Sequence, residues 1–171
     1  MGNLAIESSA LTLTPWKRNP AQTLFQFMPA LRTIWRDDLA DLAASHTRQW
    51  EIDRHESGTI LLALIAGRVV GITGWYRMSN RDAGLRWHGV LPAERHQGYS
   101  RQMIDLVCQT MPKNIRHVFE VTRNPESRDA FCRCGFDVMT DPKMICRAVK
   151  DAEYDIGVGG WVLRKLLLKI T

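Results

Sequence analysis

Two apolar runs on either side of a short turn constrain the fold of this chain most strongly. The segment TILLALIAGRVVGITGWYRM, residues 59–78, is rich in β-branched residues and is interrupted only by Ala66 and Gly67. Runs of this kind joined by a short glycine-containing turn predict a β-hairpin. The segment LRWHGVL, residues 85–91, follows closely and predicts a third strand of the same set.

The remaining segments alternate between helix and strand signals. Pro20 can occupy the first turn of a helix, and Asp37 and Asp38 suit the start of a second one. Asn124, Pro125 and Gly135 have the positions of an N-cap, an N1 proline and a C-terminal glycine of a short helix. The expected order is β-α-α-β-β-β-α-β-α-β-β. It consists of a strand at 10–16, helices at 20–35 and from 37 past 46, strands at 59–65, 68–78 and 85–91, a helix from 98 to 111, a strand at 116–122, a helix at 124–136, and strands at 136–149 and 160–170.

Length and charge limit the domain organisation and the kind of ligand. A chain of 171 residues with 45% apolar content can bury one core, so we expect a single domain over 1–171, with residues 1–9 disordered. The net charge of +5 and the pI near 9.3 favour a polyanionic ligand or partner. The phosphates of coenzyme A (CoA) would satisfy this as well as nucleic acid would.

The cysteines and histidines argue against a secreted protein and against a metal site. The sequence has no signal-peptide pattern, so the four cysteines are expected to be reduced thiols in the cytoplasm. No apolar segment approaches the roughly 18 residues of a membrane span. Cys132 and Cys134 are two positions apart on an expected helix, where side chains diverge, so we expect buried thiols and no metal. The five histidines show no i, i+4 pairing.

The segment VLPAERHQGYSRQMIDLV, residues 90–107, passes from a strand through a polar loop into helical spacing. A helix that starts directly after such a loop exposes unpaired N–H groups at the positive end of its dipole, which favours an anion. Gly98 allows close approach of a pyrophosphate to the backbone, and Arg95 and Arg101 add permanent positive charge. A solvated, capped helix end would give the same pattern.

Two motifs in the expected order resemble the GNAT N-acetyltransferase superfamily. Arg95 and Gly98 match the family's acyl-CoA pyrophosphate loop, Arg/Gln-x-x-Gly-x-Gly/Ala, and Ser100 replaces the last small residue. Val90 and Pro92 precede the loop at the family's usual offsets. Downstream, the segment Asn124–Phe136 resembles the helix Asn-x-x-Ala…Tyr-x-x-x-Gly-Phe. The resemblance covers roughly residues 58–169.

This resemblance implies an α/β fold with a mixed sheet that is splayed between its fourth and fifth strands, and acetyl-CoA as the acyl donor. The residues that it places at the cofactor are Val90, Arg95, His96, Gln97, Gly98, Tyr99, Ser100, Arg101, Asn124 and Phe131.

The family's reaction is direct acyl transfer from CoA to an amine, which needs a base for the amine proton and N–H donors for the thioester carbonyl. The resemblance places the backbone N–H near Val90 as the donor. Glu120 occupies the place of the base in ribosomal-protein alanine acetyltransferases, although its loop to Asn124 is one residue shorter. His88 is a second catalytic candidate, on the strand that borders the acceptor pocket. A solvent-facing Glu120 and a core His88 are the alternatives.

One position departs from the family pattern. The tyrosine that commonly protonates the CoA sulfur corresponds to Phe131, which cannot donate a proton. Cys132, Tyr99 or Tyr154 could substitute, or the thiolate could leave without an acid.

Two functions of different classes follow. The first is an acetyl-CoA-dependent N-acyltransferase whose acceptor is a small amine, a protein amine or an aminated nucleic acid. The second is a non-catalytic GNAT-like module that binds CoA, protein or nucleic acid. No membrane partner is expected, and a homodimer is left open.

Overall fold

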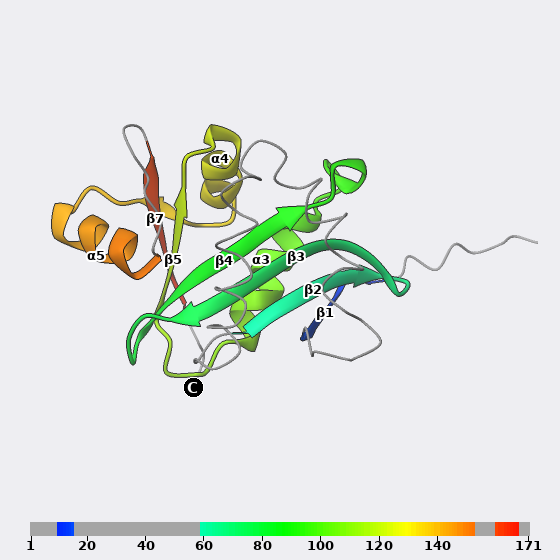
Figure 1. The fold of residues 1–171 in the computed structure, drawn as a ribbon, viewed down its shortest axis with the longest axis horizontal. Coiled ribbons are helices and arrows are strands. Elements are labelled where there is room, and N and C mark those ends of the chain that lie inside the picture. The colour runs from blue at the N-terminus through cyan, green and yellow to red at the C-terminus, as the bar shows by residue number, and fades with distance from the viewer. Residues whose placement is uncertain (1–9, 16–58, 153–159, 168–171) are drawn as a thin grey trace, which may run out of the picture.

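Seven strands form one mixed sheet in the computed structural model, which describes residues 10–15, 59–152 and 160–167. The strands lie in the order β1-β2-β3-β4-β5-β7-β6 (Figure 1). All neighbouring strands are antiparallel except β4 and β5, which are parallel. The elements are β1 Thr12–Pro15, β2 Thr59–Ile65, β3 Arg68–Arg77, β4 Asp82–Val90, the 3-10 helix η1 Pro92–Glu94, α3 Tyr99–Thr110, β5 His117–Thr122, α4 Pro125–Arg133, β6 Asp137–Val138, α5 Pro142–Ala152 and β7 Trp161–Leu166. The predicted α/β architecture with a mixed sheet is confirmed.

The predicted hairpin is present as β2 and β3. Its turn consists of Ala66 and Gly67, whose φ angles are 49° and 75°. Positive φ at both central residues is typical of the tight turns that match the twist of paired strands. The two apolar runs therefore pair along their whole lengths, from Thr59 opposite Trp75 to Ile65 opposite Arg68.

The sheet is split between its fourth and fifth strands. β4 and β5 pair from Asp82–His117 to Gly84–Phe119, and beyond these residues the two strands diverge (Figure 1). β5 continues to pair with β7 as far as Thr122. The carboxyl ends of the parallel strands are thus held apart, which is the geometry that the family resemblance implied.

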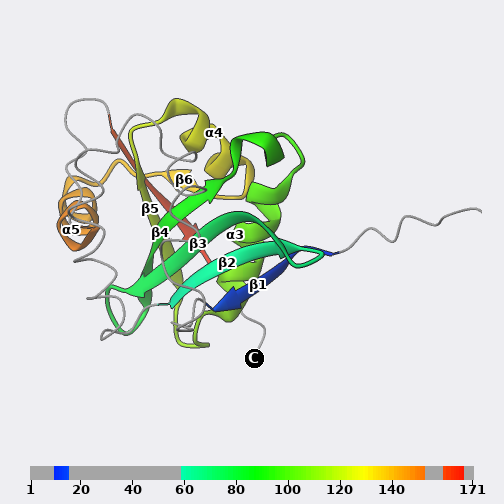
Figure 2. The same cartoon turned by 45° about the vertical axis from the view of Figure 1, so that its right-hand side comes forward.

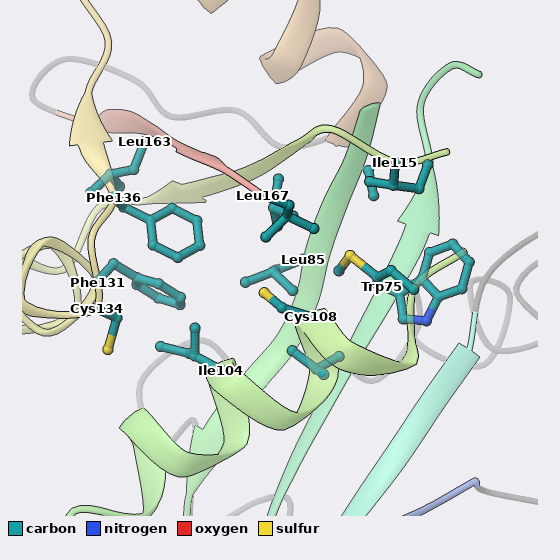
Figure 3. Close-up of a cluster of buried hydrophobic side chains, with 14 of the residues drawn as sticks. Trp75, Leu85, Ile104, Cys108, Ile115, Phe131, Cys134, Phe136, Leu163 and Leu167 are labelled. Carbon is teal, nitrogen blue, oxygen red and sulfur yellow. The ribbon is translucent and has the colours of Figure 1, made fainter. Parts of the chain in front are cut away.

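Different helices cover the two faces of the sheet. The larger apolar cluster lies between the sheet and helices α3 and α4, and includes Leu85, Ile104, Val118 and Phe131 (Figure 3). A smaller cluster around Phe119 lies against α5, which is on the other side of the sheet (Figure 2). Alternation along β5 explains this division, because successive side chains of a strand point to opposite faces.

Helix α4 begins and ends at the residues that the sequence indicated. The side-chain oxygen of Asn124 accepts hydrogen bonds from the N–H groups of Glu126, at 2.8 Å, and Ser127, at 3.3 Å. Pro125 is the first helical residue, and Gly135 follows the helix with φ 82°. These are the N-cap, N1 and C′ roles predicted for this segment.

The predicted strand over 136–149 is wrong. Only Asp137–Val138 is a strand, and the segment Pro142–Ala152 is helix α5. The Asp141 carboxylate accepts a hydrogen bond from the Lys143 N–H at 2.9 Å, and proline favours the first turn of a helix. Met144, Ile145 and Ala148 then form one apolar face, a spacing of i, i+1 and i+4, and this face packs against the sheet.

Several predictions fall outside the described ranges. These are the helices at 20–35 and from 37 past 46, the disorder of residues 1–9, and the end of the last strand at 168–170. Within the ranges that are described, no helix is long and apolar enough to span a membrane.

Candidate active site

The loop between β4 and α3 leaves the start of helix α3 open. Gly98 is the N-cap residue, with φ 77°, and the first intrahelical bond runs from the Gln102 N–H to the Gly98 carbonyl oxygen at 3.3 Å. The amides of Tyr99, Ser100 and Arg101 therefore precede the hydrogen-bond ladder of the helix. A Cβ atom added to Gly98 would meet nothing within 4 Å, so the space above this turn can hold an anion.

The same loop is fastened to strand β3 at two points. The Leu91 N–H donates to the Val70 carbonyl oxygen at 2.9 Å. The Arg68 guanidinium forms an ion pair with the Glu94 carboxylate in η1. Both contacts join the loop to β3.

The basic and polar residues predicted at the cofactor surround this helix start. The Arg95 Nε donates to the Val90 carbonyl oxygen at 3.4 Å, and Arg95, His96, Gln97 and Arg101 are exposed. His96 has φ 64°, in the left-handed region that residues other than glycine rarely adopt. The structure thus brings the predicted loop residues together on one open surface.

A β-bulge in β4 places His88 beneath this loop. Gly74 lies opposite Arg86 and Ile72 opposite Gly89, so two residues of β4, Trp87 and His88, face the single residue Thr73 of β3. Trp87 has φ 59°, and this local distortion re-aims the following side chain.

The His88 ring connects three elements. Its Nδ1 lies 3.1 Å from the Thr73 hydroxyl and its Nε2 lies 2.9 Å from the Ser100 hydroxyl at the start of α3. Its centroid is 5.2 Å from that of Phe131 in α4. Burial lowers the pKa of His88 to about 4, so the imidazole is neutral at pH 7.

Glu120 lies on β5 beyond the last residue pair that β5 shares with β4. Glu120 is two residues after Val118, so its side chain points to the same face of the sheet, toward α3 and α4. Its neighbours Phe119 and Val121 pack on the opposite face, against α5. Its Oε2 atom is buried without a hydrogen-bond partner in the described part of the chain. Burial raises the pKa of Glu120 well above its ordinary value, which makes the carboxylate a stronger base.

His88 and Glu120 therefore face the same side of the sheet, from two strands that diverge. Neither the catalytic role of Glu120 nor that of His88 is tested by this arrangement, and both stay predictions.

Two further residues predicted at the cofactor have structural roles here. Asn124 caps α4, as described above, and Phe131 is 3% exposed within the larger apolar cluster. The Phe131 ring contacts His88 on one side and Phe136 on the other, with centroids 5.2 Å apart in each case. Their contacts with a cofactor stay predictions.

The cysteines are all free thiols, but they are not all buried. Cys134 lies in the apolar cluster, and burial raises the pKa of its thiol. Cys132 is exposed, so the expectation that both are buried is wrong for Cys132. The reason is that the side chains of the last turn of α4 and its C-cap residue Cys134, two positions apart, diverge. Within the described ranges, no three histidine, cysteine or carboxylate side chains lie close enough together to hold a metal.

Sequence reasoning missed Thr73 as the buried partner of His88. Thr73 is fully buried in β3, and its one signal is a hydroxyl in the otherwise apolar stretch GITGW.

Sequence reasoning also missed a pocket of about 480 Å³ at the other end of the sheet. The pocket is lined by Asn80, Arg81, Asn114 and Arg116, which lie in the β3–β4 turn and the α3–β5 loop, and no residue predicted for catalysis lines it.

Comparison with protein families identifies the class to which this fold and site belong. The family model described as "Acetyltransferase (GNAT) family" matches residues 24–136, about two thirds of the chain. The chain therefore belongs to the GNAT acetyltransferase family, whose members transfer acyl groups from CoA. No significant match was found among curated protein sequences.

Solved structures show the same fold at low sequence identity. An acetyltransferase from Streptococcus agalactiae has a TM-score of 0.66 and 18% identity, covering 92% of this chain and 98% of that one. An acetyltransferase from Bacillus subtilis in complex with CoA has a TM-score of 0.62 and 14% identity, covering 93% and 100%. Spermidine N-acetyltransferase from Vibrio cholerae, in complex with CoA and spermine, has a TM-score of 0.61 and 13% identity, covering 91% and 95%.

Proposed function

We propose that this protein is an acetyl-CoA-dependent N-acyltransferase in which a primary amine attacks the thioester directly. One observation carries the proposal: the open start of α3 lies beside the split between β4 and β5, and on the β5 side lies Glu120, whose Oε2 atom is buried and has no hydrogen-bond partner among the described residues. An anion site, a gap between strands and a strengthened base are the three parts that the reaction needs.

In the proposed reaction, the pyrophosphate of acetyl-CoA binds the first-turn amides of α3, with Arg95 and Arg101 adding charge. The neutral amine attacks the thioester carbonyl carbon, and Glu120 accepts the amine proton, directly or through a water molecule. A backbone N–H near Val90 stabilises the negative oxygen of the tetrahedral intermediate. The carbon–sulfur bond then breaks, releasing the amide and the CoA thiolate.

The leaving thiolate has no tyrosine acid in this proposal. Phe131 is buried against His88 and Phe136, and the pKa of a free thiol is about 8.5, so the thiolate can depart unprotonated and take its proton from water. Tyr99 is half-buried beside the loop and Cys132 is exposed, whereas Tyr154 lies outside the described residues.

The acceptor is proposed only as a class. A neutral or anionic molecule that carries a primary amine, including an aminated nucleic-acid group or an amine of an acidic protein, suits a chain with a net charge of +5. The spermidine acetyltransferase named above acts on a polycation, which the charge of this chain disfavours.

We also propose that the whole chain is one domain and that it works in the cytoplasm. All four cysteines of the sequence are free thiols, which supports a reducing compartment.

The direct test is incubation with acetyl-CoA and a panel of amines while the release of free thiol is measured. The panel contains small monoamines, peptides with free α-amino or lysine groups, and amino-modified oligonucleotides. We expect thiol release with at least one class, and mass spectrometry should find acetyl on the acceptor. Glu120→Gln should abolish most of this release, whereas Glu126→Gln, at an exposed carboxylate on α4, should not. CoA binding without thiol release from any amine would favour the non-catalytic module.

A further inference from the structure

The first-turn serine of α3 is joined through one imidazole to a buried threonine of β3. Ser100 is the second residue of α3, beside the open anion position, and is half-buried. Its hydroxyl lies 2.9 Å from His88 Nε2, while His88 Nδ1 lies 3.1 Å from the hydroxyl of the fully buried Thr73. Three polar side chains from three elements thus form one chain of hydrogen bonds that ends at the surface where a phosphate would lie.

The protonation state of the ring limits the directions that these hydrogen bonds can take. Burial keeps His88 neutral at pH 7, so one ring nitrogen donates and the other accepts. If Nδ1 carries the proton, it donates to Thr73, and the Ser100 hydroxyl must donate to Nε2. If Nε2 carries the proton, it donates to Ser100, and the Thr73 hydroxyl donates to Nδ1.

The two tautomers present different groups to an anion. In the first, the Ser100 proton points inward and its oxygen lone pairs face the anion, which is repulsive. In the second, the Ser100 oxygen accepts from His88 and its own proton is free to point outward. A bound phosphate therefore selects the second tautomer, since a hydrogen bond donated to a charged acceptor is stronger than one between neutral groups.

We propose that His88 is a positioning residue that holds Ser100 as a hydrogen-bond donor to the CoA pyrophosphate. The inference rests on the proposed function, because it needs CoA on the start of α3. The proposal assigns a binding role to the Ser100 hydroxyl, at the position where the family motif has glycine or alanine. It also replaces the predicted acid–base role of His88 by one in cofactor binding.

Amide variants of His88 separate this role from a purely structural one. Glutamine places its amide nitrogen where Nε2 lies, and asparagine places its own near Nδ1, so only glutamine keeps a donor toward Ser100. We expect Ser100→Ala and His88→Asn each to weaken CoA binding about tenfold or more, measured by calorimetry. Ser100→Ala removes the hydrogen bond donated to the phosphate, and His88→Asn removes the donor that orients the Ser100 hydroxyl. His88→Gln should bind within a few-fold of the wild type. Adding His88→Asn to Ser100→Ala should cause little further loss.

The outcomes distinguish the failures. Wild-type protein that does not bind CoA would overturn the proposed function and this inference with it. Wild-type protein that binds CoA, with Ser100→Ala unchanged or with His88→Asn and His88→Gln equally affected, would overturn the inference alone. If a His88 variant does not fold, ¹⁵N NMR of the wild-type imidazole tests the proposal, because it shows which ring nitrogen carries the proton. The proton should be on Nε2 in the CoA complex, and a proton on Nδ1 there would overturn the proposal.

Discussion

His88 and Glu120 are half-buried titratable side chains, and desolvation shifts the pKa of each in the direction that favours its neutral form. The folded-state pKa of His88, about 4, lies below its ordinary value of 6.5, so the unfolded chain takes up a proton first as the pH falls. Stability is therefore lost between pH 6.5 and 4, by up to about 3 kcal/mol. Glu120 has a raised pKa in the folded state, so its contribution is lost as the pH rises from about 4.5 through that raised value.

Glu120→Gln should consequently slow the reaction and stabilise the fold. An ionised carboxylate is costly at this position because burial disfavours its charge, and glutamine removes that cost while keeping the shape. We expect the free energy of unfolding, from urea melts, to exceed that of the wild type by an amount that grows with pH above about 4.5. The acetylation rate should fall by roughly 10²-fold or more.

The dependence of the wild-type kcat/KM on pH tests whether Glu120 is the base. The rise of kcat/KM with pH should include the ionisation of Glu120 as well as that of the amine, and Glu120→Gln should lack the first of these. A variant that keeps the wild-type rate at every pH would assign the proton to water or to another group.

Phe131→Tyr should lower stability without raising the rate. The ring is 3% exposed between His88 and Phe136, so a hydroxyl at its tip enters an apolar cluster without an arranged partner. We expect a loss of about 1–3 kcal/mol in the free energy of unfolding. Phe119→Tyr, in the other cluster, is a matched control for burying a hydroxyl. Faster thiol release from Phe131→Tyr with unchanged melting would show instead that this position reaches the CoA sulfur.

At the scale of elements, the sequence predicted correctly those helices and strands whose turns and caps are formed by neighbouring residues. The glycine turn of the β2–β3 hairpin and the caps of α4 are formed by residues that are close together in the sequence. Both partners of each interaction can therefore be recognised from a short segment. Helix α5 was missed because Met144, Cys146 and Ala148 also alternate as in a strand. The helical face becomes apparent only when the sheet residues that cover it, Phe119 and Val162, are known.

The helix start of α3 can be blocked without disturbing its surroundings. Gly98→Trp places an indole over the open first turn, so CoA affinity by calorimetry should fall by more than tenfold. The substitution also forces a residue with a Cβ atom to φ 77°, which costs of order 1 kcal/mol.

Gly67→Trp is the control for that strain. Gly67 has φ 75° and equally open surroundings, but it lies in the β2–β3 turn. Both variants should lose similar stability, and only Gly98→Trp should lose affinity. Unchanged affinity in folded Gly98→Trp would remove the pyrophosphate from this loop.

At the scale of the whole molecule, the resemblance predicted the split sheet and the loop that lies beside it. It could not predict that the bulge in β4 carries His88 to both Thr73 and Ser100, because these partners are 15 and 12 residues away along the chain and meet only through the register of β3 and β4. The position of Glu120, whose Oε2 atom has no hydrogen-bond partner in the described part of the chain, likewise lies where two strands diverge. Long-range geometry of this kind has no local signature.

The strand order also determines when the molecule can finish folding during its synthesis. β7, at residues 161–166, lies between β5 and β6, and its Val162 and Leu163 are buried on opposite faces. A nascent chain that has emerged only as far as α5 has both flanking strands but lacks the one that joins them. The amino-terminal strands β1 to β4 can pair as they leave the ribosome, whereas the half that carries Glu120 has an unpaired edge until the last strand is released.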